Sequence, residues 1–287
     1  MTRANKYGLK DLQKQFPTDD ACLDYLFTST HSSDCSCGGT YKRVAGRKQF
    51  QCSKCRFQIA PTSGTIFHKS DTPLTLWYHA IFVFSNAKSG ISAKEMERQL
   101  GVTYKTAWRM LKLIREALGQ DGTKLGGDVE MDSAYFGGKG DAGKNNENLS
   151  QVMKKKAVVF AAIERGGNMK ATVMPDNTAK SHGEFLMASV ATTARLLTDS
   201  TNKLKNVATS YDRHMVDHHR FEYVRGDVHV NNVESFWAHA KRSIKGTHKV
   251  ISKKYLQSYL DGFVFHYNNR HSDKERFVAL FGALLSA

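Results

Sequence analysis

Three acidic residues, Asp132, Asp199 and Glu234, have types and spacings that suit metal-dependent chemistry. Between Asp199 and Glu234 lie 34 residues, and Lys241 follows the glutamate by seven positions. Carboxylate oxygens suit magnesium and manganese, and two such ions can stabilise both the attacking and the leaving oxygen of a displacement at phosphorus. A lone aspartate at a strand end is more often a turn or a helix cap. The set as a whole, however, predicts cutting and joining of phosphodiesters.

The sequence around these acids resembles the DDE transposases, specifically the Merlin-related branch of bacterial insertion-sequence proteins that carries an N-terminal zinc ribbon. The resemblance covers almost the whole chain. It is carried by residues 129–132 with 135–139, by residues 222–229, by Asn231 and residues 234–237 with 241–242, and by residues 265–270. It implies a ribonuclease H-like fold with Asp132 on the first strand, Asp199 just after the fourth, and Glu234 on a following helix. The three carboxylates are then expected to converge at one edge of the sheet.

The resemblance also implies a role for each side chain. Asp132 and Asp199 are expected to be the principal ligands of Mg²⁺ or Mn²⁺, with Asp132 bridging two ions and Glu234 completing one site. Lys241 falls near the helix face of Glu234, where it can meet a phosphate, and the alternative is a solvated lysine on a charged helix. Members of this branch can show asparagine as a third site residue. Asn231, one turn before Glu234, is therefore an alternative third ligand.

Other polar residues before Glu234 leave alternatives open. Asp212 and Asp217 are fallback candidates for the second acid, with shorter separations from the glutamate. Asp227 and His229 are candidates to support the carboxylates from beside the helix. The same region holds a cluster that we interpret as phosphate contacts or plain surface, because scattered histidines lack a firm metal spacing: His214, His218, His219 and Arg220.

The second half of the chain has the pattern of a mixed sheet. Apolar strands are predicted at residues 128–136, 156–164 and 169–174, then a helix near 179–191 and a strand that ends at Asp199. The polar segment at residues 139–151 is typical of a surface loop. This order is the one expected of a ribonuclease H-like domain. The fold class is therefore α/β (α+β overall), with this catalytic domain preceded by a zinc ribbon and a helix-turn-helix.

The cysteines predict a structural zinc site. Four of them are grouped and one, Cys22, stands apart in a probable short helix, where a buried free thiol is the ordinary explanation. The group is Cys35, Cys37, Cys52 and Cys55. Its first pair has only one intervening residue where the family usually has two, so Asp34 or His31 is an alternative fourth ligand, and weak metal binding is a third possibility. Four basic residues of the ribbon are candidate phosphate contacts: Arg47, Lys48, Lys54 and Arg56.

Residues 91–110 have the rhythm of a helix-turn-helix. Gly101 allows the sharp turn between two helices, and Pro73 suits the first turn of a preceding helix that extends to about Ser85. The second helix of the motif is expected to display four side chains toward a major groove: Tyr104, Lys105, Arg109 and Lys112. An ordinary helical hairpin has the same period. The surrounding charge and the preceding ribbon favour DNA binding.

Length and charge agree with a nucleic-acid partner. The chain has 287 residues, a net charge of +15 and a pI near 9.6. Residues 35–69 contain seven Lys or Arg and no Asp or Glu. No transmembrane stretch, basic membrane-surface helix or apolar signal core is evident, so we expect a soluble cytoplasmic protein with no membrane partner. The expected domains are an N-terminal helical segment (1–30), a zinc ribbon (31–62), a helix-turn-helix region (73–120) and the catalytic domain (126–287).

Together these features predict a DNA transposase. Such an enzyme binds the terminal inverted repeats of its element, hydrolyses a strand at each end and joins the free 3′-hydroxyls to target DNA. Since two ends must be held together, a homodimer or larger assembly on double-stranded DNA is expected from the reaction. The alternatives are a DNA-binding regulator derived from a transposase and a ribonuclease H-like nuclease without strand transfer.

Overall fold

The computed structural model describes residues 6–119, 121–137 and 155–285, which form two compact units. The first unit comprises the residues up to Leu118 together with those from Asn269 onward, and the second comprises Gly119–Asn268. The surface loop predicted at residues 139–151 lies outside the described residues. Among the described residues, every helix is too short or too polar to cross a lipid bilayer.

The first unit begins with two helices and a small sheet. Helices α1 (Leu9–Gln15) and α2 (Asp19–Thr30) precede the antiparallel strands β1 (Tyr41–Arg43), β2 (Phe50–Cys52) and β3 (Gln58–Ile59). Thr18 caps α2 by accepting the Ala21 N–H, as its residue type favours. The Phe27 ring of α2 stacks on Phe50 of β2, with their centroids 4.0 Å apart. This contact joins the ribbon sheet to the helices.

The helix-turn-helix predicted from the sequence is confirmed. Helix α3 (Leu74–Asn86) is followed by α4 (Ala93–Leu100) and α5 (Tyr104–Glu116). Ser92 and Thr103 cap α4 and α5 by accepting backbone N–H groups of their first turns. Gly101 ends α4 in the left-handed region at φ 66°, the conformation that lets the chain turn sharply into α5.

The C-terminal helix α10 (Asp273–Leu285) belongs to the first unit. Its Phe281 ring packs edge-on against Tyr78 of α3, with centroids 4.9 Å apart. Arg276, only 1% exposed, donates hydrogen bonds to the carbonyl oxygens of Ser85 and Asn269. Because these aromatic and guanidinium groups are buried against α3, residues 269–287 fold with the N-terminal unit, whereas the sequence pattern extended the catalytic domain to residue 287.

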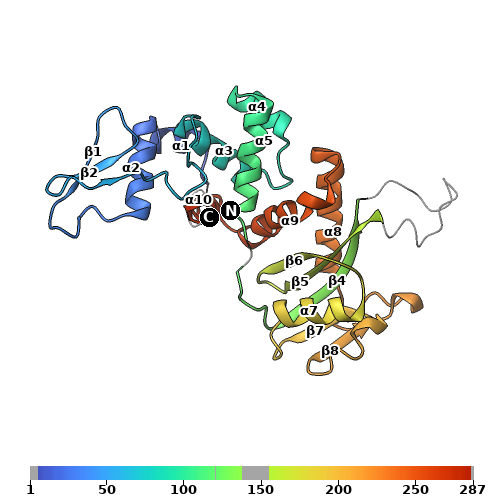
Figure 1. Cartoon of the computed structure of the whole chain (residues 1–287). Helices are drawn as coiled ribbons and strands as arrows, with labels where there is room; N and C mark the ends of the chain where they lie inside the picture. The colour runs from blue at the N-terminus through green and yellow to red at the C-terminus, as the bar shows by residue number, and fades with distance from the viewer. Residues whose placement is uncertain (1–5, 120, 138–154, 286–287) are drawn as a thin grey trace. The chain divides into compact units, whose positions relative to one another are not determined.

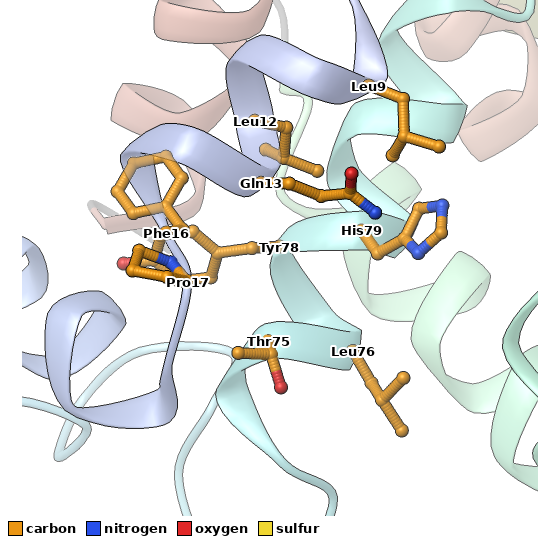
Figure 2. Close-up of a pocket in the computed structure, with 9 residues that line it drawn as sticks. All are labelled: Leu9, Leu12, Gln13, Phe16, Pro17, Thr75, Leu76, Tyr78 and His79. Atoms are coloured by element: carbon orange, nitrogen blue, oxygen red, sulfur yellow. The ribbon is translucent and has the colours of Figure 1, made fainter.

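A pocket of about 330 Å³ lies between the α1 segment and α3. Figure 2 shows Leu9, Leu12 and Phe16 on one side of this pocket and Leu76 and His79 on the other. Its lining is mostly apolar and contains none of the predicted metal ligands or DNA contacts. We therefore regard it as a packing feature of the first unit.

The second unit is built on a five-stranded sheet with the order β6-β5-β4-β7-β8. Strands β4 (Asp128–Phe136), β5 (Ala157–Glu164) and β6 (Met169–Met174) are antiparallel neighbours. Strands β7 (Arg195–Asp199) and β8 (Asp212–Val216) run parallel to β4 on its other side. This mixed sheet confirms the ribonuclease H-like fold and brings the strand ends of β4 and β7 side by side.

Helices cover both faces of this sheet (Figure 1). Helix α7 (Ala179–Ser189) packs on Val129 and Met131 of β4, while α8 (Asn231–Ser243) and α9 (Lys253–Asn268) pack on Ala134 and Phe136. Successive strand residues point to opposite faces, so Asp132 faces the α8 side. Short helical turns η2 (Asn202–Leu204) and η3 (His218–Arg220) follow β7 and β8, and the π-helical turn η4 (Ile244–His248) continues α8.

Candidate active site

Asp132 and Asp199 lie on adjacent parallel strands. Met131 of β4 is paired with Thr198 of β7, so the two aspartates come next on each strand. Strand β7 ends at Asp199 while β4 continues to Phe136, which leaves the edge of β4 open beyond the acids. Both aspartates line the same small pocket at this place. The parallel pairing of β4 and β7 thus brings together two acids that are distant in the sequence.

The surroundings of Asp132 favour a bound cation. Its Oδ2 accepts a hydrogen bond from Trp237 Nε1 at 3.0 Å, and Trp237 is 5% exposed on α8. Burial raises the pKa of the Asp132 carboxyl to about 6, and the charges of Asp199 and Glu234 act in the same direction. A carboxyl group disfavoured by burial and by two like charges gains from a neighbouring metal ion. Trp237 packs in the core of this unit and also contacts the acid directly.

Glu234 lies in the first turn of α8, at the rim of this arrangement. Its side chain is 49% exposed, and its Oε1 lies 3.9 Å from Nδ1 of His218. It does not line the pocket that Asp132 and Asp199 share, although its charge contributes to the raised pKa of Asp132. Asn231, the alternative third ligand, is exposed at the first position of the same helix. The geometry keeps both residues available and does not choose between them.

Lys241 is exposed on α8, two turns after Glu234. Its Nζ lies 5.8 Å from the ring centroid of Phe136, which in turn packs edge-on against Trp237. Phe136 and Asp132 are on the same face of β4, so these ring contacts hold the lysine stem beside the strand that carries the acid. A cation in this position is available for a phosphate.

Glu130 organises the start of α8, and the sequence analysis assigned it no role of its own. Its carboxylate is fully buried and accepts hydrogen bonds from the backbone N–H groups of Asn232 and Val233 at 2.8 and 3.3 Å. Arg165 Nε donates to the same carboxylate at 2.8 Å, and His229 Nδ1 lies 3.2 Å away. A glutamate two residues before Asp132 thereby caps the helix that carries Glu234.

Arg165 extends this clamp to the segment before α8. Besides binding Glu130, its guanidinium donates to the carbonyl oxygens of Asp227 and His229 at 2.8 and 3.1 Å. Asp227 itself accepts hydrogen bonds from Arg195, which lower the pKa of its carboxyl to about 2. Asp227 and His229, expected to support the site, contact Arg195 and Glu130. Their contacts fix the backbone from which α8 starts.

Asp212 and Asp217, the fallback candidates for the second acid, contact other residues. Asp212, at the start of β8, pairs with His214 at 3.0 Å. Asp217 accepts a hydrogen bond from Ser200 Oγ at 3.1 Å, so it touches the residue that follows Asp199. Neither acid lines the pocket shared by Asp132 and Asp199. The geometry therefore groups Asp199, in preference to Asp212 or Asp217, with Asp132.

His182 of α7 also lines the carboxylate pocket, and the sequence analysis did not single it out. It is 4% exposed, and its Nε2 lies 2.8 Å from Oδ1 of Asn177. Burial lowers the pKa of His182 to about 4, so the ring is neutral near pH 7. A lone histidine in a helix gives no sequence signal for such a position, because the pocket is formed only when α7 packs on the sheet.

The four grouped cysteines converge in the first unit. Their sulfur atoms all lie within 4.8 Å of one another, with Cys35 and Cys55 at 3.7 Å and Cys37 and Cys52 at 3.5 Å. Thiolates held tetrahedrally at the usual zinc distance are about 3.8 Å apart, so this donor set fits zinc. Among the described residues no other set of three or more His, Cys, Asp or Glu side chains brings its ligand atoms so close together, and this includes the candidate acids Asp132, Asp199 and Glu234.

Local hydrogen bonds favour the thiolate form of Cys35, the form in which a cysteine binds zinc. The backbone N–H of Cys37 and the Tyr41 hydroxyl lower the pKa of the Cys35 thiol to about 6. A Cβ atom at Gly39 would lie 2.6 Å from the Cys52 sulfur, so glycine is needed where the chain passes the cluster. Of the alternative ligands, His31 stacks on Phe27 and lies 2.6 Å from Thr30 Oγ1. Cys35 itself is the fourth member of the cluster, despite its short spacing.

Most of the predicted DNA contacts are exposed. All four ribbon residues, Arg47, Lys48, Lys54 and Arg56, are at the surface, as are Tyr104, Lys105 and Arg109 of α5. Lys112 is half-buried, pairs with Glu116 at 3.4 Å and lies over the Trp108 ring at 5.9 Å. Its availability for phosphate is therefore lower than the helix period indicated. The others present exposed cationic or aromatic groups on the ribbon and on α5.

Comparison with known proteins assigns the family. Residues 124–268 of the 287 match the ISXO2-like transposase domain, a span that covers both strand acids, Glu234 and Lys241. The chain belongs to this transposase family. It is also 26% identical over 229 residues to an uncharacterized protein in the transposable element ISH50 of Halobacterium salinarum, with 75% of this chain and 77% of that protein covered. The resemblance inferred from the sequence is thus confirmed.

Membership of this transposase family indicates three general properties of the chain. It indicates an enzyme that cleaves nucleic acid, a protein that binds DNA, and a reaction that uses divalent metal ions. Asp132 and Asp199 supply the hard oxygen donors that such ions require, in a pocket where burial and like charge disfavour the ionised form of Asp132. The residues present therefore fit the metal that the family implies.

Proposed function

We propose that this protein is a DNA transposase that binds the terminal inverted repeats of its own insertion sequence, cleaves a strand at each end and transfers the 3′-ends to target DNA. The observation that supports the proposal most strongly is the position of Asp132 and Asp199 on adjacent parallel strands, where both line one small pocket. Glu234, whose charge acts on Asp132, stands at the rim on α8. This is the donor set of a metal-dependent phosphodiester site.

In this proposal Asp132, Asp199 and Glu234 hold Mg²⁺ or Mn²⁺, with Asn231 as the alternative third ligand. These residues would hold the metal ions, which would supply activation of the attacking oxygen and stabilisation of the leaving oxygen. Lys241, held over Phe136, contacts a phosphate of the cleaved strand. Trp237 keeps the Asp132 carboxylate in one orientation through its Nε1 hydrogen bond. Glu130 fixes the start of α8 and thereby the approach of Glu234 to the strand acids.

The first unit is proposed to bind the repeats. Its zinc ribbon, residues 31–62, and its helix-turn-helix region, residues 73–120, carry the exposed cations and Tyr104 described above. A zinc ion on the four cysteines maintains the ribbon fold that presents Lys54 and Arg56. The second unit then supplies the chemistry, with both ends of the element held together by at least two copies of the chain.

The test is an assay with linear DNA carrying the element ends, a supercoiled target and Mg²⁺ or Mn²⁺, with all products sequenced. The proposal predicts cleavage at the element boundary and covalent joining of the 3′-ends to the target. Cleavage without joining would instead identify a ribonuclease H-like nuclease. Specific binding of the repeats with intact strands would identify a DNA-binding regulator, and both results would overturn the proposed function.

A further inference from the structure

The segment from Asp217 to Arg225 adjoins the proposed active site at two places. Asp217 Oδ1 accepts a hydrogen bond from Ser200, the residue after Asp199, at 3.1 Å. His218 Nδ1 lies 3.9 Å from Glu234 Oε1, and the His218 ring packs on Tyr223 with centroids 5.0 Å apart. The segment therefore lies beside two of the three proposed metal-binding acids.

Hydrogen bonds within the segment hold its backbone in one shape. The N–H groups of Phe221 and Glu222 donate to the carbonyl oxygens of His218 and Asp217, each at 3.1 Å. The Glu222 carboxylate accepts from the Asp217 N–H at 3.3 Å and from Arg225 Nε at 2.7 Å. The turn is thus closed by both backbone and side-chain contacts.

Phe221 lies in this turn with an unfavourable backbone conformation and an exposed apolar side chain. Its φ is 58°, in the left-handed region that a bulky residue seldom adopts. Its ring is 83% exposed, so the strained backbone gains no burial of the side chain in return. Strain of this kind at a surface position beside a site is an indication of function when packing does not explain it. The Phe221 ring is therefore a candidate contact for a molecule outside this chain's own fold.

The chemistry around the ring fits a nucleic-acid base. Arg220, 86% exposed, is the preceding residue, and Tyr223 adds a second aromatic ring that is 54% exposed. Exposed aromatic rings stack on unpaired bases or insert between base steps, and flanking arginines contact the adjoining phosphates. Val224, 51% exposed, extends the apolar surface. The family already indicates that DNA is the substrate.

We propose that Phe221 stacks on a base of the substrate DNA next to the cleaved phosphodiester and holds that base out of the helical stack. This inference rests on the function proposed above. A base removed from the stack loosens the duplex beside the scissile bond, so the strand can reach Asp132 and Asp199. Arg220 holds the neighbouring phosphate while the ring stays against the displaced base.

The test compares wild type with Phe221→Gly, Phe221→Trp and Met187→Ala. Glycine removes the ring but tolerates the left-handed backbone, tryptophan keeps a stacking surface, and Met187 is a 59% exposed apolar residue on α7 that serves as the control. The readout is the cleavage rate on duplex element ends and on the same ends with one abasic position beside the cleaved bond. The fluorescence of 2-aminopurine at that position reports unstacking in Ca²⁺, without cleavage.

Phe221→Gly is expected to cleave the intact duplex about tenfold more slowly, in line with the stacking contribution of one aromatic ring. On the abasic substrate its rate should return to within about twofold of wild type, because no base needs to be displaced. Phe221→Trp and Met187→Ala should match wild type on both substrates. The 2-aminopurine signal should rise with wild type and stay low with Phe221→Gly.

Three results would overturn the inference while leaving the transposase proposal intact. The first is wild-type cleavage of the intact duplex by Phe221→Gly. The second is an equal loss on both substrates or a markedly lower unfolding temperature, which would make the ring structural. The third is a changed sedimentation coefficient without DNA, which would make the ring a contact between copies of the chain. Absence of metal-dependent cleavage by wild type itself would refute the proposed function, and this inference with it.

Discussion

At the scale of the residue, the burial of the Asp132 carboxyl opposes its ionisation. Its carboxyl lies beside Trp237 on a strand at the centre of the sheet, and two further acids act on it. In an unfolded chain an aspartate has a pKa of about 3.9. Folding without metal therefore becomes less favourable as the pH rises from that value through about 6, because the ionised carboxylate must then be buried.

This conflict predicts that Asp132→Asn stabilises the metal-free protein. The amide cannot ionise, so above pH 6 the variant should exceed wild type by up to about 3 kcal/mol in free energy of unfolding, and the difference should vanish below about pH 4. Urea unfolding in EDTA across this pH range measures it, with the exposed Asp212→Asn as the control. A stability difference that does not change with pH would contradict this account of Asp132.

Sequence reasoning was effective for the residues whose signal is local. Asp199 ends the five-residue strand β7, in which Leu196 and Leu197 are buried, and Glu234 follows the start of an amphipathic helix, so both could be placed on their elements in advance. Glu130 and His182 could not be assigned a role in this way. The cap that Glu130 provides involves residues more than 100 positions away, and the pocket beside His182 exists only after α7 packs on β4.

At the scale of the element, the position of α8 depends on a buried charge. Glu130 accepts two backbone N–H groups at the helix start and pairs with Arg165 and His229. The arrangement joins β4, which carries Asp132, to the helix that carries Glu234. Removing the Glu130 charge would leave backbone N–H groups and the Arg165 guanidinium without their buried partner. Such a loss costs free energy of folding.

Glu130→Gln is therefore expected to lower the free energy of unfolding of the second unit by about 3 kcal/mol. Glutamine keeps the shape of the side chain but loses the negative charge that Arg165 and the helix start require. Urea unfolding measures the change, with Glu184→Gln as the control because that glutamate is half-exposed on α7. An unchanged unfolding midpoint would show that the clamp contributes nothing to the position of α8.

The ribbon gives a second prediction for an element. Cys52→Ser should lose bound zinc and weaken repeat binding, because the four sulfur atoms within 4.8 Å would be reduced to three. Cys22→Ala is the matched control, since that buried thiol lies on α2 and outside the cluster. The zinc released from each purified protein measures the metal content, and we expect about one ion per chain for wild type and for Cys22→Ala. Full zinc content in Cys52→Ser would contradict the assignment.

At the scale of the whole molecule, the chain returns to its first unit after completing the second. The sequence predicted the zinc ribbon, the helix-turn-helix and the mixed sheet, because each has a local pattern of cysteines, caps or apolar strands. It could not predict that residues 269–287 fold with α3, since an amphipathic helix carries no record of which face it will cover. Arg276 and the Phe281 ring decide that choice through contacts across about 200 residues of sequence.

This arrangement predicts that Phe281→Ala destabilises the N-terminal unit selectively. The ring is 2% exposed and contacts Tyr25, Phe67, Tyr78 and Phe277, so its removal should cost about 3–5 kcal/mol. Hydrogen exchange should accelerate in α2 and α3, while β4 and β5 keep their protection. Exposed Val278→Ala on the same helix should change neither unit. Faster exchange in β4 and β5 of the Phe281 variant would contradict the division into two units.

The central claim is that Asp132, Asp199 and Glu234 form one metal-dependent cleavage site, and strand cleavage at the element ends tests it most directly. Asp132→Asn, Asp199→Asn and Glu234→Gln are each expected to cut on the order of a thousandfold more slowly in Mg²⁺ or Mn²⁺, because metal ions contribute several kcal/mol to such reactions. Repeat binding should stay near wild type, and Asp212→Asn should cut normally. Wild-type cleavage by any of the three variants, or its loss in Asp212→Asn, would contradict the account.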